Sequence, residues 1–217
     1  MKLVLMSAVN TPEITRKIVE LVGKPAEKIN VVIINEASAP EAGDKRWLFK
    51  GFDCIAKSFG GEIDICQLLH LGIDEIEKRV CKADVIWCFG GSTDYLKFIL
   101  DKTGFAKLLP KVFEENVWVG SSAGACVLGN RPTFSVDKET YGTDEYLRFV
   151  NFSLRPHIWS DYVAKDMYGK CLAESKRQPY PVYAISDECA IIVENQKAYL
   201  IGKRGQKIEN GIITEEV

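Results

Sequence analysis

The sequence predicts a single α/β domain spanning residues 1–217, a three-layer sandwich in which helices cover both faces of a mostly parallel central sheet. Short runs rich in β-branched residues alternate with longer amphipathic segments, which is the order typical of strands and helices around a parallel sheet. The run at 84–89 is uniformly apolar, as expected for a strand covered on both faces. With 47% hydrophobic residues among 217, the chain can bury one substantial core.

The first half of the chain shows this alternation most clearly. Thr11 and Pro12 are start signals for a helix after the first strand, and Gly23 is its stop signal. Strands are expected at 2–7, 30–38, 61–69, 84–89 and 117–120, and helices at 11–23, 46–60, 72–83, 90–104 and 105–116. Pro110 is expected to break or kink the last of these helices.

Beyond residue 130 the pattern becomes looser. Residues 131–146 are polar and rich in turn formers, and this segment is long enough to suggest a functional loop. Strands are then expected at 148–156, 181–186, 189–194 and 197–202, with a helix at 160–177. The last two strands should form a hairpin through Asn195 and Gln196.

The composition argues against several classes of protein. The 28 basic and 30 acidic residues give a net charge of -2 with no basic block, which argues against nucleic acid as a partner. No run reaches about 18 apolar residues and no secretory signal is evident, so we expect a cytoplasmic protein without a membrane contact. The seven cysteines are scattered without a CxxC pair, which indicates reduced thiols, and no metal or cofactor is expected.

Ser122 is the candidate nucleophile. Residues 120–124 read GSSAG, a match to G-x-S-x-G between a predicted strand and a predicted short helix, where the motif forms a nucleophile elbow. Such a serine needs small neighbours because its backbone is cramped, and Gly120, Ala123 and Gly124 meet that need. Its hydroxyl would project from the carboxyl end of a central strand, and the Ala123 amide would stabilise an oxyanion formed there. The alternative is a small-residue turn required only for packing.

A serine nucleophile needs a base, and the chain has two histidines. His70 precedes the serine and follows the third predicted strand, and we interpret it as a packed or surface residue. His157 follows a later strand, behind Pro156, on a loop of the kind that carries catalytic residues. His157 is therefore the candidate general base.

A carboxylate should orient the imidazole and stabilise its charged form. Asp137 lies in the polar loop between the candidate nucleophile and the candidate base. The other carboxylates near enough in sequence are Asp144, Glu145, Asp161, Asp187 and Glu188. The residues alone leave this choice open.

Gly90 and Gly91 form a second strand-to-helix junction. They lack the third glycine of a dinucleotide fingerprint and the lysine of a phosphate loop, so a phosphate site is weakly supported. Adjacent parallel strands would bring this turn to the same sheet edge as Ser122. The Gly91 amide is thus the candidate second oxyanion donor.

Taken together, these segments resemble the peptidase E family, the aspartyl dipeptidases whose relatives include cyanophycinase. The matching elements are GGSTDYL (90–96), GSSAGA (120–125), Asp137 at the family's spacing behind the serine, and PHIWSDY (156–162). The conjunction is specific although each element alone is not, and with the order of strands and helices it spans nearly the whole chain.

The resemblance implies a flavodoxin-like or class I glutamine amidotransferase-like sandwich. It also implies a serine peptidase in which Ser122 is the nucleophile and His157 is the general base and then the acid. Asp137 matches the third member of the triad, and the Asp187–Glu188 segment is held in reserve.

The same resemblance implies hydrolysis of short peptides, above all dipeptides with an N-terminal aspartate, whose side chain needs a cation. Arg131 and Arg155 are the arginines nearest in sequence to the proposed triad, and either is a candidate. Two departures bear on the pocket: Ser92 stands where the family commonly has Asn or Asp, and Cys126 follows the nucleophile segment.

Other readings remain open. One is a serine hydrolase of another substrate preference, either an esterase or a cyanophycinase-like enzyme. An esterase of the α/β-hydrolase type usually places its histidine late in the chain, and here no histidine follows His157. A glutamine amidotransferase would need cysteine in place of Ser122. The alternative from another class is a non-catalytic module that binds a small anion at the two glycine turns. The sequence leaves the oligomeric state open, and a homodimer is one arrangement that it allows.

Overall fold

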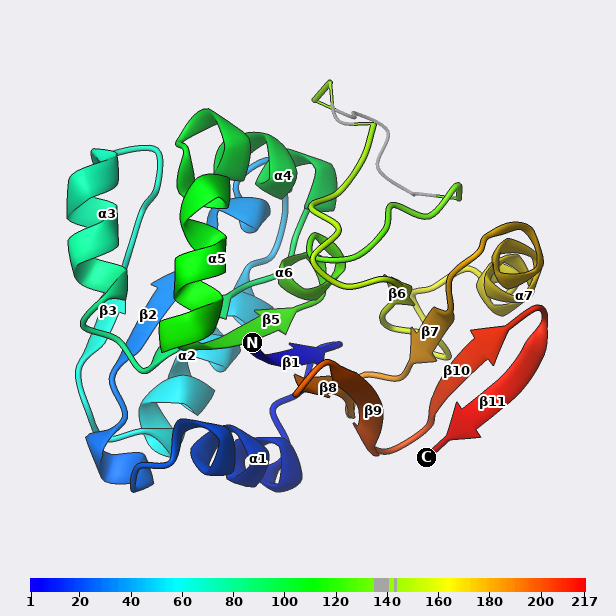
Figure 1. Ribbon diagram of the computed structural model, residues 1–217, viewed down its shortest axis with the longest axis horizontal. Helices are drawn as coiled ribbons and strands as arrows, with labels where there is room; N and C mark the ends of the chain where they lie inside the picture. Colours follow the sequence, from blue (N-terminus) through cyan, green and yellow to red (C-terminus); the bar gives the residue numbers. More distant parts are fainter. Residues whose placement is uncertain (135–140, 143) are drawn as a thin grey trace.

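A sheet with helices on both faces forms the centre of the protein (Figure 1). The computed structural model describes residues 1–134, 141–142 and 144–217, and in these ranges the central sheet has seven strands in the order β3-β2-β4-β5-β1-β8-β9. Their bounds are β1 Lys2–Met6, β2 Val31–Ile34, β3 Ile63–Ile65, β4 Val85–Cys88, β5 Val117–Ser121, β8 Cys189–Glu194 and β9 Lys197–Gly202. The first five pair in parallel, and β8 and β9 are antiparallel. The predicted mostly parallel sheet is confirmed.

Two hydrophobic cores lie on opposite faces of this sheet. The helices are α1 Pro12–Val22, α2 Arg46–Ser58, α3 Ile73–Val80, α4 Thr93–Lys102, α5 Phe105–Glu115 and the short α6 Ala123–Cys126. Because side chains alternate along a strand, Val4 and Met6 of β1 pack with α1 and α2, and Leu3 and Leu5 pack with α3, α4 and α5. The three-layer sandwich predicted from the sequence is therefore present.

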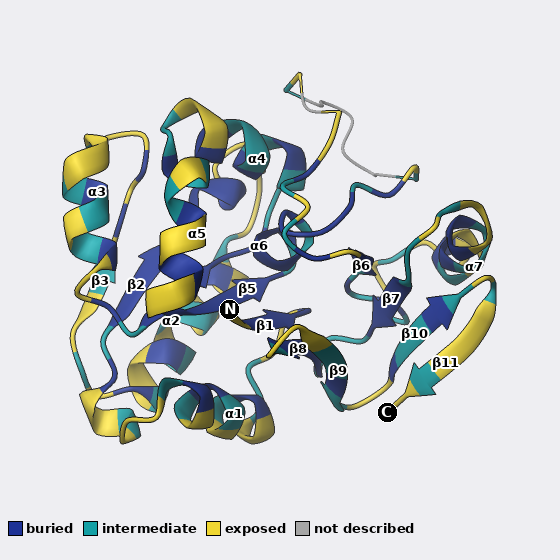
Figure 2. Ribbon diagram, in the orientation of Figure 1, coloured by how far each residue is buried: buried dark blue, intermediate teal, exposed yellow. Residues whose placement is uncertain are grey.

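The last third of the chain adds a second, four-stranded sheet, in the order β11-β10-β7-β6. Its strands are β6 Ser153–Arg155, β7 Val182–Ile185, β10 Gly205–Glu209 and β11 Ile212–Glu216. The helix α7 (Met167–Arg177) packs on one face, while Leu154 and Tyr183 on the other face join the core of the main sheet. The sequence analysis did not predict β10 and β11, and much of β11 is exposed (Figure 2).

Local signals at element ends were predicted well. Thr11 accepts a hydrogen bond from the amide of Ile14, and Gly23 ends α1 at φ 75°. Asn195 and Gln196 join β8 and β9 at φ 50° and 64°, the left-handed conformation that a tight hairpin requires. None of the described helices is long and apolar enough to span a membrane.

Several predicted elements are shorter than expected. The strand predicted at 30–38 ends at Ile34 and continues as a 3₁₀ turn, Glu36–Ser38; the one predicted at 61–69 is only Ile63–Ile65, and the one predicted at 148–156 is only Ser153–Arg155.

Two helices also differ from the prediction. The helix predicted at 160–177 begins at Met167, because Ser160 and Tyr162 hydrogen-bond to a carboxylate instead of continuing the helix. Pro110 was expected to break or kink α5, and it does not break the helix, which runs from Phe105 to Glu115. Pro110 lies on the exposed face, where water can reach the carbonyl that loses its N–H partner.

Candidate active site

Ser122 lies between β5 and α6, at the carboxyl end of a central strand. Its backbone has φ 50° and ψ −111°, a strained conformation for a residue with a side chain. The chain passes very close to itself here: a Cβ on Gly120 would lie 2.2 Å from the Gly124 carbonyl oxygen, and one on Gly124 would lie 2.1 Å from the Cys88 carbonyl oxygen. The structure therefore explains why this corner has almost no side chains.

His157 reaches Ser122 from the second sheet. It follows β6 on a loop, and its Nε2 lies 3.0 Å from Ser122 Oγ. The residue is held at φ 63°, another left-handed conformation that is uncommon without glycine. The two groups that the sequence placed in one site, 35 residues apart, are thus within hydrogen-bonding distance.

The carboxylate that meets the imidazole is Asp187. Its Oδ1 lies 2.6 Å from His157 Nδ1, and Asp187 follows β7, the neighbour of β6. Asp137, the predicted third member, lies outside the described residues. Of the reserve segment, Asp187 faces the histidine while Glu188 forms an ion pair with Lys203 at 2.8 Å. The alternative Glu145 is paired with Arg148 at 3.1 Å.

The surroundings shift both pKa values downward. Burial lowers the pKa of His157 and outweighs the opposing hydrogen bond and charge of Asp187, and the charge of Arg155 lowers it further. Burial acts to raise the pKa of Asp187, but the hydrogen bonds from Ser160 and His157 outweigh it and lower that pKa. At neutral pH the site therefore holds a neutral imidazole beside an ionised carboxylate.

The sequence analysis missed three hydroxyls around Asp187. Ser160 donates to Oδ2 at 2.6 Å, Tyr162 lies 3.3 Å from Oδ1, and Ser7 donates to Oδ1 at 3.3 Å. Tyr162 Oη also lies 2.8 Å from Nδ1 of the histidine. Ser160 and Tyr162 belong to the PHIWSDY segment. Ser7 directly follows β1, whose carboxyl end lies beside that of β5, and this position could have marked Ser7 as a residue of the site.

The Gly90–Gly91 turn lies against Ser122, as predicted from the order of the strands. A Cβ on Gly90 would lie 3.4 Å from Ser122 Oγ. Ala123 begins α6, so its amide has no acceptor within the helix. Ser92 accepts a hydrogen bond from the Tyr95 amide and caps α4, a role that Asn or Asp would also fill.

The two candidate arginines differ in their surroundings. Arg131 makes a bidentate ion pair with the fully buried Asp94, at 3.0 and 2.8 Å. Arg155 precedes the histidine by two residues, and its Nε is buried with no hydrogen-bond partner in the described part of the chain. Its charge lowers the pKa of His157, so Arg155 lies near the site, with an Nε donor that no described residue accepts from.

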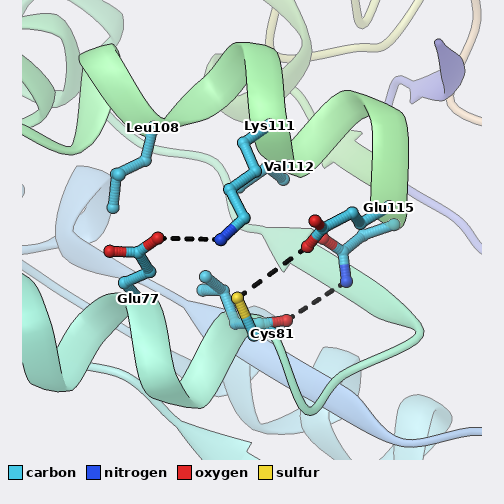
Figure 3. A pocket seen from close by; sticks show the side chains of 8 residues that line it. Glu77, Cys81, Leu108, Lys111, Val112 and Glu115 are labelled. Atoms are coloured by element: carbon cyan, nitrogen blue, oxygen red, sulfur yellow. Dashed lines mark hydrogen bonds and ion pairs between the residues drawn. The ribbon is translucent and has the colours of Figure 1, made fainter.

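Other candidate features lie away from this site. His70 is exposed, beyond the edge strand β3. Within the described residues no group of three or more His, Cys, Asp or Glu side chains could hold a metal ion. A hollow between α3 and α5 includes Cys81, Lys111 and Asn116 (Figure 3). Asn116 precedes β5 and Ser122 follows it, so this hollow lies near the amino end of β5, and the candidate site lies at its carboxyl end.

Comparison with known proteins identifies the family of this chain. The model of peptidase family S51 matches residues 3–201. An uncharacterized peptidase of Listeria monocytogenes is 28% identical over 150 residues, which cover 65% of this chain and 71% of the relative. An uncharacterized peptidase of Pasteurella multocida is 25% identical over 152 residues, covering 66% of this chain and 72% of the relative.

Solved structures share the fold. The crystal structure of a candidate peptidase E protein from Listeria monocytogenes superposes with a TM-score of 0.74 at 21% identity, covering 93% of this chain and 98% of that one. The crystal structure of a peptidase from an acI-B1 actinobacterium gives a TM-score of 0.73 at 17% identity, covering 100% and 96%. At these identities the likeness concerns the fold alone.

Proposed function

This chain belongs to peptidase family S51, and from that premise we propose that it is a serine peptidase whose triad is Ser122, His157 and Asp187. The observation that carries the proposal is the continuous chain of contacts between these side chains. Ser122 Oγ is 3.0 Å from His157 Nε2, and His157 Nδ1 is 2.6 Å from Asp187 Oδ1. A nucleophile, a base and an orienting carboxylate in this order define a triad by geometry rather than by sequence position.

The first half of the proposed reaction forms an acyl-enzyme. With its proton on Nδ1 facing Asp187, His157 accepts the Ser122 proton at Nε2 as Oγ bonds to the scissile carbonyl carbon. The carbonyl oxygen gains negative charge, and the amides of Ala123 and Gly91 are the proposed donors to it. The imidazolium then gives its proton to the leaving amine as the C–N bond breaks.

The second half releases the acyl group. Water enters where the amine left, gives a proton to His157 Nε2 and attacks the acyl carbon, and the proton then returns to Ser122 Oγ as its bond to carbon breaks. The ionised Asp187 stabilises the imidazolium in both halves. Its depressed pKa supports this role, because a protonated carboxyl would lose most of that attraction.

Asp187 is proposed as the triad acid in place of Asp137, which the resemblance favoured. The support for Asp187 is its contact with the imidazole. A direct comparison of the Asp187→Asn and Asp137→Asn variants decides between the two carboxylates, as developed in the Discussion.

The proposed substrates are short peptides, above all dipeptides with an N-terminal aspartate. The resemblance of the chain to the aspartyl dipeptidases supports this class, and Arg155 is the proposed partner of the aspartate side chain. Arg155 is preferred to Arg131 because the latter is committed to Asp94 through two hydrogen bonds, whereas Nε of Arg155 is buried without a partner among the described residues. A guanidinium with a free donor among the described residues is suited to bind a carboxylate.

Turnover of a small dipeptide panel tests the proposal. Peptides that differ only in the first residue, with aspartate, asparagine, glutamate or alanine, should be hydrolysed fastest when aspartate leads. Ser122→Ala should abolish turnover, and Ser121→Ala is the matched control because Ser121 is the preceding residue, at the end of β5. Turnover retained in Ser122→Ala contradicts the serine mechanism, and equal rates across the panel contradict the substrate class.

A further inference from the structure

Ser7 lies at the junction of the two halves of the triad. It follows β1, which lies between β5 and β8 in the main sheet, and it is fully buried at 0% exposure. β5 leads to Ser122, and Asp187 closely precedes β8. The end of β1 is therefore the point in the sheet where the elements that carry the nucleophile and the carboxylate come together.

The Ser7 hydroxyl contacts both partners of the nucleophile. Its Oγ accepts a hydrogen bond from the backbone N–H of His157 at 2.8 Å and donates to Asp187 Oδ1 at 3.3 Å. Oγ also lies 3.3 Å from His157 Nδ1. A hydroxyl has a single proton, so accepting from the amide and donating to the carboxylate together fix its orientation.

The backbones of His157 and Asp187 are held in different ways. His157 sits at φ 63°, a backbone conformation that costs free energy for a residue with a Cβ and persists where its surroundings enforce it. Asp187 is tied to the same end of β1 through its carbonyl oxygen, which accepts from the Val9 amide at 2.8 Å. The Ser7 hydroxyl is the side-chain bridge between the strained histidine and the anchored carboxylate.

We propose that Ser7 is a positioning residue for the triad, one whose buried hydroxyl fixes His157 and Asp187 relative to each other. This inference rests on the proposed serine-peptidase function. Ser160 and Tyr162 also bond to Asp187, but they belong to the loop of His157 itself. Ser7 differs from them because it connects that loop to the central sheet, which also carries Ser122.

The proposal predicts two effects of removing the hydroxyl. Losing a hydrogen bond to a charged group that sets the reacting geometry should slow the reaction of Ser122 roughly 10- to 100-fold. Without the Ser7 donor, the negative charge of Asp187 is less dispersed. The carboxylate should then stabilise the imidazolium more strongly, which raises the pKa of His157. A residue that served packing alone would produce no such pH shift.

Labelling of Ser122 by a fluorophosphonate measures both effects without knowledge of the substrate. The second-order labelling rate should be followed from pH 5 to pH 9 in the full chain, with Ser122→Ala as the blank. Ser7→Ala should label roughly 10- to 100-fold more slowly than the unaltered chain, with its acid limb moved to higher pH. Ser7→Cys keeps the shape of the side chain with a somewhat larger atom that is only a weak donor, so it should resemble Ser7→Ala.

Ser175→Ala is the matched control. Ser175 is also buried, and its hydroxyl likewise donates one hydrogen bond, to the Leu172 carbonyl, and accepts one, from the Gly211 amide. It should label at the rate of the unaltered chain. Three results would each overturn the positioning role. Ser7→Ala could label as fast as this control, Ser7→Cys could label at the full rate, or the slowed reaction could keep the acid limb of its pH profile in place.

The same experiment separates the inference from the function on which it rests. An unaltered chain that is not labelled at Ser122 contradicts the serine peptidase and the positioning role together. An unaltered chain that is labelled, with Ser7→Ala unaffected, contradicts the positioning role alone.

Discussion

Replacing Asp187 by asparagine should nearly abolish hydrolysis while leaving the fold intact. Asparagine keeps the size and shape of the side chain, so the surrounding packing is preserved. It removes the negative charge beside His157 Nδ1, 2.6 Å away in the intact site, and its amide group no longer selects the imidazole tautomer with the proton on Nδ1.

The structure sets the size of the effect. The side chains of His157 and Asp187 are 19% and 31% exposed, so an effective dielectric constant near 20 is appropriate rather than that of a dry interior. At that value, unit charges about 4 Å apart attract by about 4 kcal/mol. A loss of this size from the step that forms the imidazolium corresponds to about 1,000-fold in rate, and loss of the correct tautomer extends the range to about 10,000-fold.

The assay is kcat for an aspartyl dipeptide, measured at saturating peptide, with thermal unfolding as a check on the fold. Glu188→Gln is the matched control, because this neighbour pairs with Lys203 instead of the histidine, and it should stay within about twofold of the unaltered enzyme. The reasoning is refuted if Asp187→Asn keeps a tenth or more of the activity while Asp137→Asn loses it.

Four further predictions concern pH, substrate charge and packing. Since burial lowers the pKa of His157 and the neutral imidazole is the active form, kcat/KM should rise with pH around a midpoint below 6.5, measured as a pH profile. Arg155→Gln should raise KM for aspartyl dipeptides by about 10- to 100-fold and leave KM for alanyl dipeptides unchanged. Arg131→Met removes the bidentate partner of the buried Asp94 and should lower the free energy of unfolding by about 3 kcal/mol in a urea titration. Gly124→Ala would place a Cβ 2.1 Å from a backbone carbonyl oxygen and should lower the unfolding free energy by about 1–3 kcal/mol or more, measured in the same way.

The central sheet could be predicted because its signals are local. β4 is a continuous apolar run, and α1 has its cap and its stop residue in the sequence itself. The β10–β11 hairpin has a local signal, the Asn210–Gly211 turn at φ 52° and 76°, which the sequence analysis missed. The pairing of β7 with β10 could not be predicted, because it joins segments that no short window of sequence connects. The start of α7 was missed for a related reason. The segment before it turns toward Asp187, a residue 27 positions away from Ser160.

The candidate site divides in the same way. Ser122 could be identified because its small neighbours are adjacent in sequence, and the close approaches of Gly120 and Gly124 give the physical reason. His157 could be identified because histidine is scarce in this chain. The carboxylate could not be chosen from the residues, since loop carboxylates are common and only the fold decides which of them reaches Nδ1.

The most direct test of the account is the position of the covalent adduct after reaction with a fluorophosphonate, read by mass spectrometry of peptides from the labelled chain. We expect one adduct, on Ser122, which disappears in Ser122→Ala and forms far more slowly in His157→Ala. An adduct on another residue, or labelling of Ser122 at an unchanged rate without the imidazole, would contradict the proposed triad.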